Sequence, residues 1–245
     1  MLEVRDLALH LRLQGVWAQL RAGEITAICG PNGAGKSSLL ASLAGLIVPQ
    51  GGSVMLDGVP LLTMPARQRA QAIGYLPQDG QVAWDMAVAA LVALGRLPHG
   101  DERTAQGRLA VERALAALDL LAFARRLVSS LSGGERARVL LARVMAGEPR
   151  WILADEPLAA LDLGHQLALL ATLRNAARGG AGVVLVLHDL GLAMNHADRV
   201  LVLQQGRLVA DGVPEAALAA QTIGDVWGVS ARWLGEAGAR ALVAA

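Results

Sequence analysis

The glycine-rich stretch over residues 30–38, Gly-Pro-Asn-Gly-Ala-Gly-Lys-Ser-Ser, constrains the fold more than any other part of the chain. An apolar run over 24–29 precedes it and predicts a buried strand, and an apolar run over 39–44 follows it and predicts a helix. Glycines let the backbone take positive φ, so that successive N–H groups point inward at the start of a helix. The order of strand, turn and helix therefore predicts an anion-binding loop.

Two side chains of this phosphate loop (residues 30–38) match groups that bind a nucleoside triphosphate with Mg²⁺. Lys36 would reach the β- and γ-phosphates, and the Ser37 hydroxyl would ligate Mg²⁺. Lys36 is the single lysine among 22 lysines and arginines, which fits a position where a compact ammonium must lie among phosphate oxygens. The alternative is a glycine-rich turn that only caps a helix.

Two carboxylates end a second apolar run. Residues 151–154 predict a central strand, and Asp155 and Glu156 follow it directly. Ligands of α/β sheets bind at the carboxyl ends of the strands. We expect Asp155 to hold the water shell of Mg²⁺ and Glu156 to polarise a water for in-line attack on the γ-phosphate.

Polar side chains also follow two other predicted strands. His188 comes after the strand over 183–187, and Gln78 comes shortly after the strand over 73–76. At the same sheet edge, His188 can donate a hydrogen bond to the γ-phosphate. Gln78 is a neutral candidate ligand for Mg²⁺ and for the attacking water.

Residues 131–135, Leu-Ser-Gly-Gly-Glu, predict a second anion-binding helix start. Ser132 is a preferred helix cap, and Gly133 and Gly134 would expose backbone N–H groups. By itself this pattern fits an ordinary capped helix equally well.

Hydrophobic periodicity indicates an α/β core with a helical insertion. Alternating apolar residues over 1–28 predict a small antiparallel sheet, and helical spacing over about 81–147 predicts an inserted lobe. Residues 151–245 return to alternating strands and helices, which implies a parallel sheet covered on both faces. We therefore predict a single domain over 1–245, with 1–80 and 148–245 as the nucleotide-binding core and 81–147 as the helical subdomain that carries 131–135.

Composition argues against several classes of protein. A net charge of +1 with scattered basic residues gives no case for nucleic acid as the main partner. Hydrophobic residues make up 54%, yet the longest apolar candidate, 86–94, is too short to cross a membrane. Charges at Glu3, Arg5 and Asp6 lead us to expect no secretory signal.

The single cysteine, Cys29, excludes a disulfide framework and fits a reducing compartment. Its place in the strand before the phosphate loop predicts a small buried side chain; the alternative is an oxidation-sensitive thiol under the nucleotide.

Taken together, these motifs closely resemble those of the ATP-binding subunits of ABC transporters over nearly the whole chain. The signature-type motif lies in the order that separates this family from other phosphate-loop proteins. The matches are to Walker A at 30–37, the Q-loop at Gln78, the family signature at 131–135, Walker B at 151–156, the D-loop at 160–162 and the switch histidine at His188.

The resemblance implies a P-loop NTPase (RecA-like) core and an ATP hydrolase that uses Mg²⁺. Glu156 and His188 would be catalytic, and Ser37, Gln78 and Asp155 would lie at the metal. ATP would be contacted by Gly30, Pro31, Asn32, Gly33, Ala34, Gly35, Lys36, Ser37, Ser38, Gln78, Ser132, Gly133, Gly134, Glu135 and Asp162.

The same resemblance implies a head-to-tail homodimer, with each ATP held between Walker A of one chain and 132–134 of the other. It also implies a peripheral position on the cytoplasmic face of a bacterial inner membrane, bound to a separate permease. A periplasmic or extracytoplasmic substrate-binding protein would act indirectly, and no nucleic acid is expected.

Three local segments narrow the subfamily. Residues 92–99, 161–166 and 188–193 are similar to the ATPases of importers for iron–siderophore, haem and cobalamin complexes. We therefore expect the chain to power uptake of such a complex. The alternatives are a soluble ABC-type ATPase that acts as a nucleotide-gated clamp in DNA repair or translation, and a regulatory module that uses ATP only for dimerisation. His99 and His165 also have a plainer interpretation as solvated surface residues.

Two departures from the family pattern concern the nucleotide. Many members carry a Tyr or Phe upstream of Walker A that stacks on adenine, whereas His10 and Trp17 are the aromatic rings before Gly30 here. Trp17 is expected to be an apolar strand residue, so we expect weak discrimination between ATP and GTP. Ser38 and Glu135 replace the more common threonine and glutamine, and both keep a hydroxyl or a side-chain carbonyl.

Overall fold

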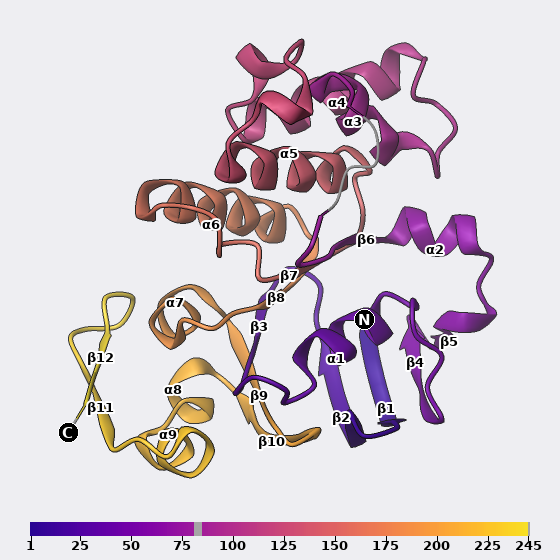
Figure 1. Cartoon of the computed structure of the whole chain (residues 1–245). Helices are drawn as coiled ribbons and strands as arrows, with labels where there is room; N and C mark the ends of the chain where they lie inside the picture. Colours follow the sequence, from indigo (N-terminus) through magenta and orange to yellow (C-terminus); the bar gives the residue numbers. More distant parts are fainter. Residues whose placement is uncertain (81–84, 245) are drawn as a thin grey trace.

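A six-stranded sheet lies at the centre of the computed structural model, which describes residues 1–80 and 85–244 (Figure 1). Five strands run parallel, and one edge strand, β10, is antiparallel to its neighbour. The parallel arrangement expected for the core is therefore confirmed. In spatial order the strands are β10 (Arg207–Gly212), β9 (Arg199–Gln204), β3 (Ile25–Cys29), β8 (Gly182–Val186), β7 (Trp151–Asp155) and β6 (Ile73–Leu76).

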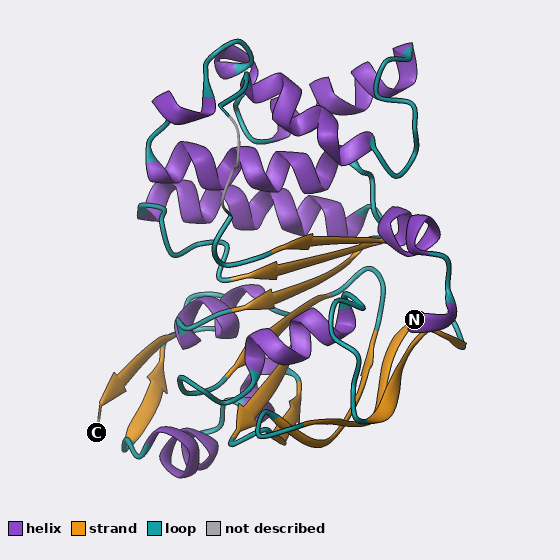
Figure 2. Cartoon of the chain, turned by 45° about the vertical axis from the view of Figure 1, so that its right-hand side comes forward, coloured by secondary structure: helices purple, strands orange, loops and turns teal. Residues whose placement is uncertain are grey.

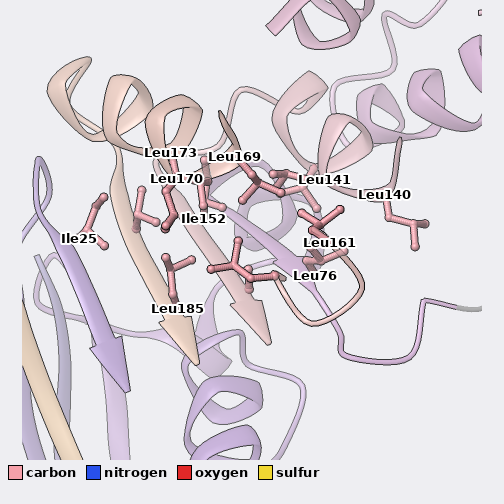
Figure 3. Close-up of a cluster of buried hydrophobic side chains, with 14 of the residues drawn as sticks. Ile25, Leu76, Leu140, Leu141, Ile152, Leu161, Leu169, Leu170, Leu173 and Leu185 are labelled. Atoms are coloured by element: carbon pink, nitrogen blue, oxygen red, sulfur yellow. The ribbon is translucent and has the colours of Figure 1, made fainter. Parts of the chain in front are cut away.

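Both faces of the parallel strands are buried, and alternate residues of these strands join different apolar clusters. In β3, Ile25 and Ala27 belong to the cluster shared with the helices α5 and α6, whereas Ile28 belongs to the cluster under α1. Figure 3 shows the first cluster, in which Ile152 and Leu185 of the strands meet leucines of α6. Continuous apolar runs therefore mark the central strands of this chain.

A second sheet covers the α1 side of the molecule. It is antiparallel, with the order β2 (Leu13–Leu20), β1 (Leu2–Leu9), β4 (Gly51–Leu56) and β5 (Val59–Pro60). The antiparallel sheet expected over 1–28 is present, and β4 and β5 extend it. Trp17 lies on β2 as expected, but its side chain is on the outer face and 59% exposed.

Helices gather at one end of the molecule and over the central sheet (Figure 2). Helices α3, α4 and α5 pack against one another and fall within the segment predicted to be helical. The helices are α1 (Lys36–Leu43), α2 (Ala66–Ala72), α3 (Val88–Ala93), α4 (Ala105–Ala117), α5 (Gly133–Ala146), α6 (Leu163–Arg178), α7 (Leu190–His196), α8 (Pro214–Ala217) and α9 (Ala220–Trp227).

Helix α1 begins at Lys36, inside the glycine-rich loop and ahead of the apolar run that predicted it. The first helical hydrogen bond runs from Leu39 N to the Gly35 carbonyl, 2.9 Å away. The polar residues Lys36, Ser37 and Ser38 therefore form the first turn of the helix. Apolar periodicity misses such a turn because its side chains are selected for a ligand rather than for the core.

The C-terminal segment packs on the core, with the hairpin β11 (Ala231–Leu234) and β12 (Ala241–Ala244) beside α7. The Trp233 indole donates to the Leu218 carbonyl at 2.8 Å, and Arg240 pairs with Glu215 at 3.1 Å. Within residues 1–80 and 85–244, none of the helices has the length and apolar character needed to cross a membrane.

Candidate active site

The phosphate loop connects β3 to α1 through backbone conformations that only glycine adopts without strain. Gly30 has φ 150° and Gly35 has φ 101°. A Cβ on Gly30 would lie 2.2 Å from the Leu203 carbonyl oxygen, and one on Gly35 would lie 2.5 Å from that of Arg12. The loop therefore packs closely against Leu203 of β9 and against the turn that holds Arg12. The first N–H groups of α1 have no partner within the helix, so they are available to an anion.

Lys36 is buried against the loop that it belongs to, with 6% of its surface exposed. Its Nζ donates to the carbonyl oxygens of Gly30 at 2.9 Å and Pro31 at 3.0 Å. Burial lowers the pKa of this ammonium, and the charge of Glu156 opposes that effect. Because an ammonium has three donors, one is left for an anion in the loop.

Asp155 is the last residue of β7 and lies next to the Ser37 hydroxyl. Only 3% of its surface is exposed. Its Oδ1 has no hydrogen-bond partner in the part of the chain that the structure describes. Burial raises the pKa of Asp155, and hydrogen bonding by the Ser37 hydroxyl opposes the rise. A buried carboxylate oxygen beside a hydroxyl fits a hydrated divalent cation.

Groups of three or more His, Cys, Asp or Glu placed to hold a metal ion are absent from the described residues.

Glu156 joins three strand ends. Its Oε1 lies 2.5 Å from His188 Nε2, and its Oε2 accepts from Gln78 Nε2 at 2.9 Å. The strands β6, β7 and β8 are parallel neighbours, so their carboxyl ends bring these three residues to one edge. Glu156 itself has φ 51°, an uncommon left-handed conformation for a side-chain-bearing residue.

A cavity of about 690 Å³ connects this trio to the phosphate loop. Its size suits a nucleotide, and its polar groups converge from five segments of the chain. We call it the main cavity; it is lined by Arg12, Asn32, Gly33, Ala34, Gly35, Lys36, Ser37, Ser38, Gln78, Glu156 and His188.

The motif over 131–135 lies outside the lining of the main cavity. Ser132 caps α5, its Oγ accepting from Glu135 N at 3.3 Å, while Glu135 Oε2 accepts from Ser132 N at 2.7 Å. The hydrogen bond from the Ser132 backbone is the main reason that the pKa of Glu135 is lowered. The two predicted anion-binding helix starts therefore do not meet in one cavity of this chain.

Asp162 also lies apart from the main cavity, as the cap of α6. Its Oδ1 accepts from His165 N at 2.9 Å, and His165 Nδ1 lies 2.9 Å from each carboxylate oxygen. These contacts, the backbone one first, lower the pKa of Asp162. His165 is thus exposed yet partnered, and His99 is half-buried with its Nε2 2.9 Å from the Gly147 carbonyl.

The structure adds one residue that the motifs did not single out. Arg12, in the turn between β1 and β2, lines the main cavity, and its Nη1 lies 3.4 Å from Ser38 Oγ. Trp17 instead lines a separate depression with Glu3 and Arg199. The short turn before Gly15 was the available signal, because a short turn brings the residues at its tip close to the phosphate loop.

Cys29 is fully buried, and burial raises the pKa of its thiol to about 12. At neutral pH the side chain is therefore an uncharged thiol, which behaves as a small apolar group in the sheet and not as a reactive thiolate.

Comparisons with known proteins agree with this geometry. A family model described as ABC transporter matches residues 13–159. A curated "Hemin import ATP-binding protein HmuV" from Gloeobacter violaceus is 45% identical over 235 residues, covering 90% of this chain and 85% of that protein. The Nocardia farcinica protein of the same name is 49% identical over 205 residues, covering 80% and 69%.

Solved structures give the same picture. An inward-facing metal-chelate type ABC transporter matches with a TM-score of 0.85 and 27% identity, covering 100% of this chain and 96% of that chain. A dimeric bacterial ABC transporter cassette matches with a TM-score of 0.77 and 25% identity, covering 87% and 99%.

Proposed function

The chain belongs to the ABC transporter family, and from this premise we propose that it is the ATP-hydrolysing subunit of an importer that takes up haem. The observation that carries hydrolysis is the contact of Glu156 with both Gln78 and His188 at the rim of the phosphate-loop cavity. Haem is favoured among metal chelates because the curated relatives named above are hemin importers.

Binding of ATP follows from the order of groups along the main cavity. The Lys36 ammonium and the first amides of α1 would hold the β- and γ-phosphates. When bound, Mg²⁺ would neutralise phosphate charge, with Ser37 as a ligand and with Asp155 and Gln78 at its water shell. Glu156 and His188 then lie at the end of the cavity that the γ-phosphate would occupy.

Glu156 is the residue best placed to orient the attacking water. Both of its carboxylate oxygens are held by Gln78 and His188 in this structure. Each carboxylate oxygen can accept a second hydrogen bond, so Glu156 can also accept one from a water in line with the γ-phosphate. We infer that His188 can exchange this contact for one with the γ-phosphate, since its side chain is 45% exposed.

A second copy of the chain would complete the site. Ser132, Gly133 and Gly134 begin a helix that does not reach the main cavity of its own chain. In a head-to-tail dimer they would approach the nucleotide of the partner chain, with Glu135 and Asp162 close to the same interface. The similarity to a dimeric cassette supports this arrangement.

The helical segment over 81–147 would form the lobe that contacts a permease, while 1–80 and 148–245 form the nucleotide-binding core. The assembly would lie on the cytoplasmic face of the inner membrane, and a substrate-binding protein would deliver the chelate from outside. The similarity to a complete metal-chelate type transporter supports this placement.

The test is to tag a Glu156→Gln chain, express it in its own cell and identify what copurifies from detergent-solubilised membranes. We expect a multi-span permease in equal amount, and ATP turnover at least about 100-fold below wild type. Glu112→Gln, an exposed position on α4, is the matched control and should keep its turnover. A cytosolic or nucleic-acid partner would instead support the clamp alternative.

Substrate choice is tested with the same permease. Cells that lack this chain but keep the permease should lose haem uptake and regain it with the wild-type chain but not with Glu156→Gln. Loss of ferric-siderophore or cobalamin uptake, with haem uptake intact, would support the importer function but exclude haem as its substrate.

A further inference from the structure

The base end of the nucleotide site is formed by Arg12: we propose that its guanidinium stacks on the face of the nucleobase, taking the role of an aromatic ring. The inference rests on the proposed binding of ATP in the main cavity. It assigns the group that decides how strongly the protein distinguishes one nucleotide from another.

The direction of the cavity places Arg12 beyond the phosphates. Gln78, Glu156 and His188 follow the strands β6, β7 and β8, and the phosphate loop with Lys36 and Ser37 follows β3, the next strand of the sheet. Ser38 comes next along α1, and Arg12 Nη1 lies 3.4 Å from its hydroxyl oxygen. A triphosphate that begins at Glu156 therefore points its ribose and base toward Arg12.

The backbone of Arg12 is fixed to the phosphate loop. Its N–H donates to the Leu9 carbonyl at 3.0 Å, and its carbonyl oxygen lies 2.5 Å from the position that a Cβ on Gly35 would occupy. Gly206 ties the two segments together, donating to the Ala34 carbonyl at 3.0 Å and accepting from Gln14 N at 2.8 Å. The turn therefore holds a constant position relative to any nucleotide in the loop.

The side chain of Arg12, by contrast, is exposed, and its contact with Ser38 is long for a hydrogen bond. The side chain can therefore rotate to contact a base with little loss of hydrogen-bond energy. A guanidinium is planar and always charged, and it stacks on aromatic faces. In the described residues that line the cavity, the only ring is that of His188, which is held by Glu156 at the other end.

Stacking of this kind is tolerant of base identity, because every base offers a π face. The assignment therefore predicts that ATP and GTP bind with similar affinity, within about tenfold of each other. It also predicts that Arg12 contributes to the binding affinity for nucleotides but not to that for inorganic tripolyphosphate.

The experiment measures dissociation constants of ATP, GTP and inorganic tripolyphosphate, each with Mg²⁺, for the full chain and its variants. For Arg12→Ala we expect ATP and GTP to weaken about tenfold, with tripolyphosphate changed less than about twofold. Arg12→Tyr should restore ATP binding to within about threefold of wild type. Arg12→Lys, which keeps the charge but loses the plane, should recover less than Arg12→Tyr.

Arg21→Ala is the matched control, since Arg21 is an exposed arginine beyond the opposite end of β2. It should leave all three affinities unchanged. Equal weakening of ATP and tripolyphosphate in Arg12→Ala would make Arg12 a phosphate contact and overturn base stacking. Unchanged ATP binding in Arg12→Ala would also overturn it. Failure of the wild-type chain to bind ATP or tripolyphosphate would instead reject the proposed function.

Discussion

Two helix N-termini of this molecule, those of α1 and α5, offer similar backbone groups but are closed in opposite ways. Gly35 caps α1 with a left-handed backbone and without a side chain, whereas Ser132 and Glu135 cap α5 with a reciprocal pair of hydrogen bonds. The first turn of α1 is therefore open to a ligand. The start of α5 is already partly satisfied by its own chain, and it can add contacts to a ligand held elsewhere.

The two helix starts also differ in the charge of the side chain that lies there. A buried ammonium, that of Lys36, stands at the start of α1 beside the positive end of the helix dipole. Such a concentration of positive potential is unfavourable until an anion arrives. At α5 the first turn holds the Glu135 carboxylate, which compensates the dipole in the isolated chain. The start of α1 therefore suits an anionic ligand, whereas the start of α5 is stable without one.

The comparison is tested most strongly by adding a methyl group at each helix start. Gly35→Ala should destabilise the protein by about 3 kcal/mol, because the Cβ meets the Arg12 carbonyl at 2.5 Å and φ is 101°. Gly133→Ala should change stability by less than about 0.5 kcal/mol, since none of the described atoms lies within 4 Å of its Cβ. Urea unfolding of both variants measures the difference.

The same pair separates folding from function. Gly133→Ala should bind ATP as a monomer like wild type. In the proposed head-to-tail dimer the added methyl would lie at the partner's nucleotide, so its ATPase activity should fall. Equal destabilisation by the two variants would show that the helix starts are not closed differently.

Asp155→Asn tests whether the α1 site is held ready for a cation. Burial raises the folded-state pKa of Asp155, so its ionised form destabilises the nucleotide-free protein, and wild-type stability rises as pH falls through that pKa. At neutral pH Asp155→Asn should stabilise the nucleotide-free protein by about 1 kcal/mol. The gain should shrink at acid pH, as measured by urea unfolding across a pH series.

With Mg²⁺ and ATP present the order should reverse, because ligand binding stabilises the folded state and the neutral amide is a poorer partner for the cation. A destabilised Asp155→Asn chain without nucleotide would mean that the carboxylate is satisfied by the protein alone.

Glu135→Gln gives the smallest effect and tests the closure of α5. The folded-state pKa of Glu135 lies below its ordinary 4.5, so its stabilising contribution is fully present above pH 4.5 and is lost as pH falls through the folded pKa. Glu135→Gln should therefore be slightly less stable than wild type at neutral pH and equal to it in strong acid. Thermal unfolding at several pH values measures the difference.

Thr104→Ala, which removes the neutral side-chain cap of α4, is the control, because this loss should cost about 1 kcal/mol at every pH. If the effect of Glu135→Gln on stability did not depend on pH, the charge of Glu135 would not be what stabilises the α5 cap.

Periodicity and spacing predicted much of the fold. The strand over 73–76 has the predicted bounds, and the strand predicted over 151–154 is present and extends to Asp155. Because β6, β7 and β8 pair in parallel, their carboxyl ends bring Gln78, Glu156 and His188 to one edge of the sheet. Sequence reasoning was weaker where a side chain serves a ligand, as in the first turn of α1.

The sequence by itself determined the phosphate loop, the α/β core and the residues that end its strands, because local patterns of glycine, apolar and polar residues specify such elements. Only the tertiary structure decided that Arg12 reaches the main cavity, that Trp17 faces outward and that 131–135 lies away from it. These depend on how separate segments pack, and packing is set by contacts between residues far apart in the chain, which no local pattern contains.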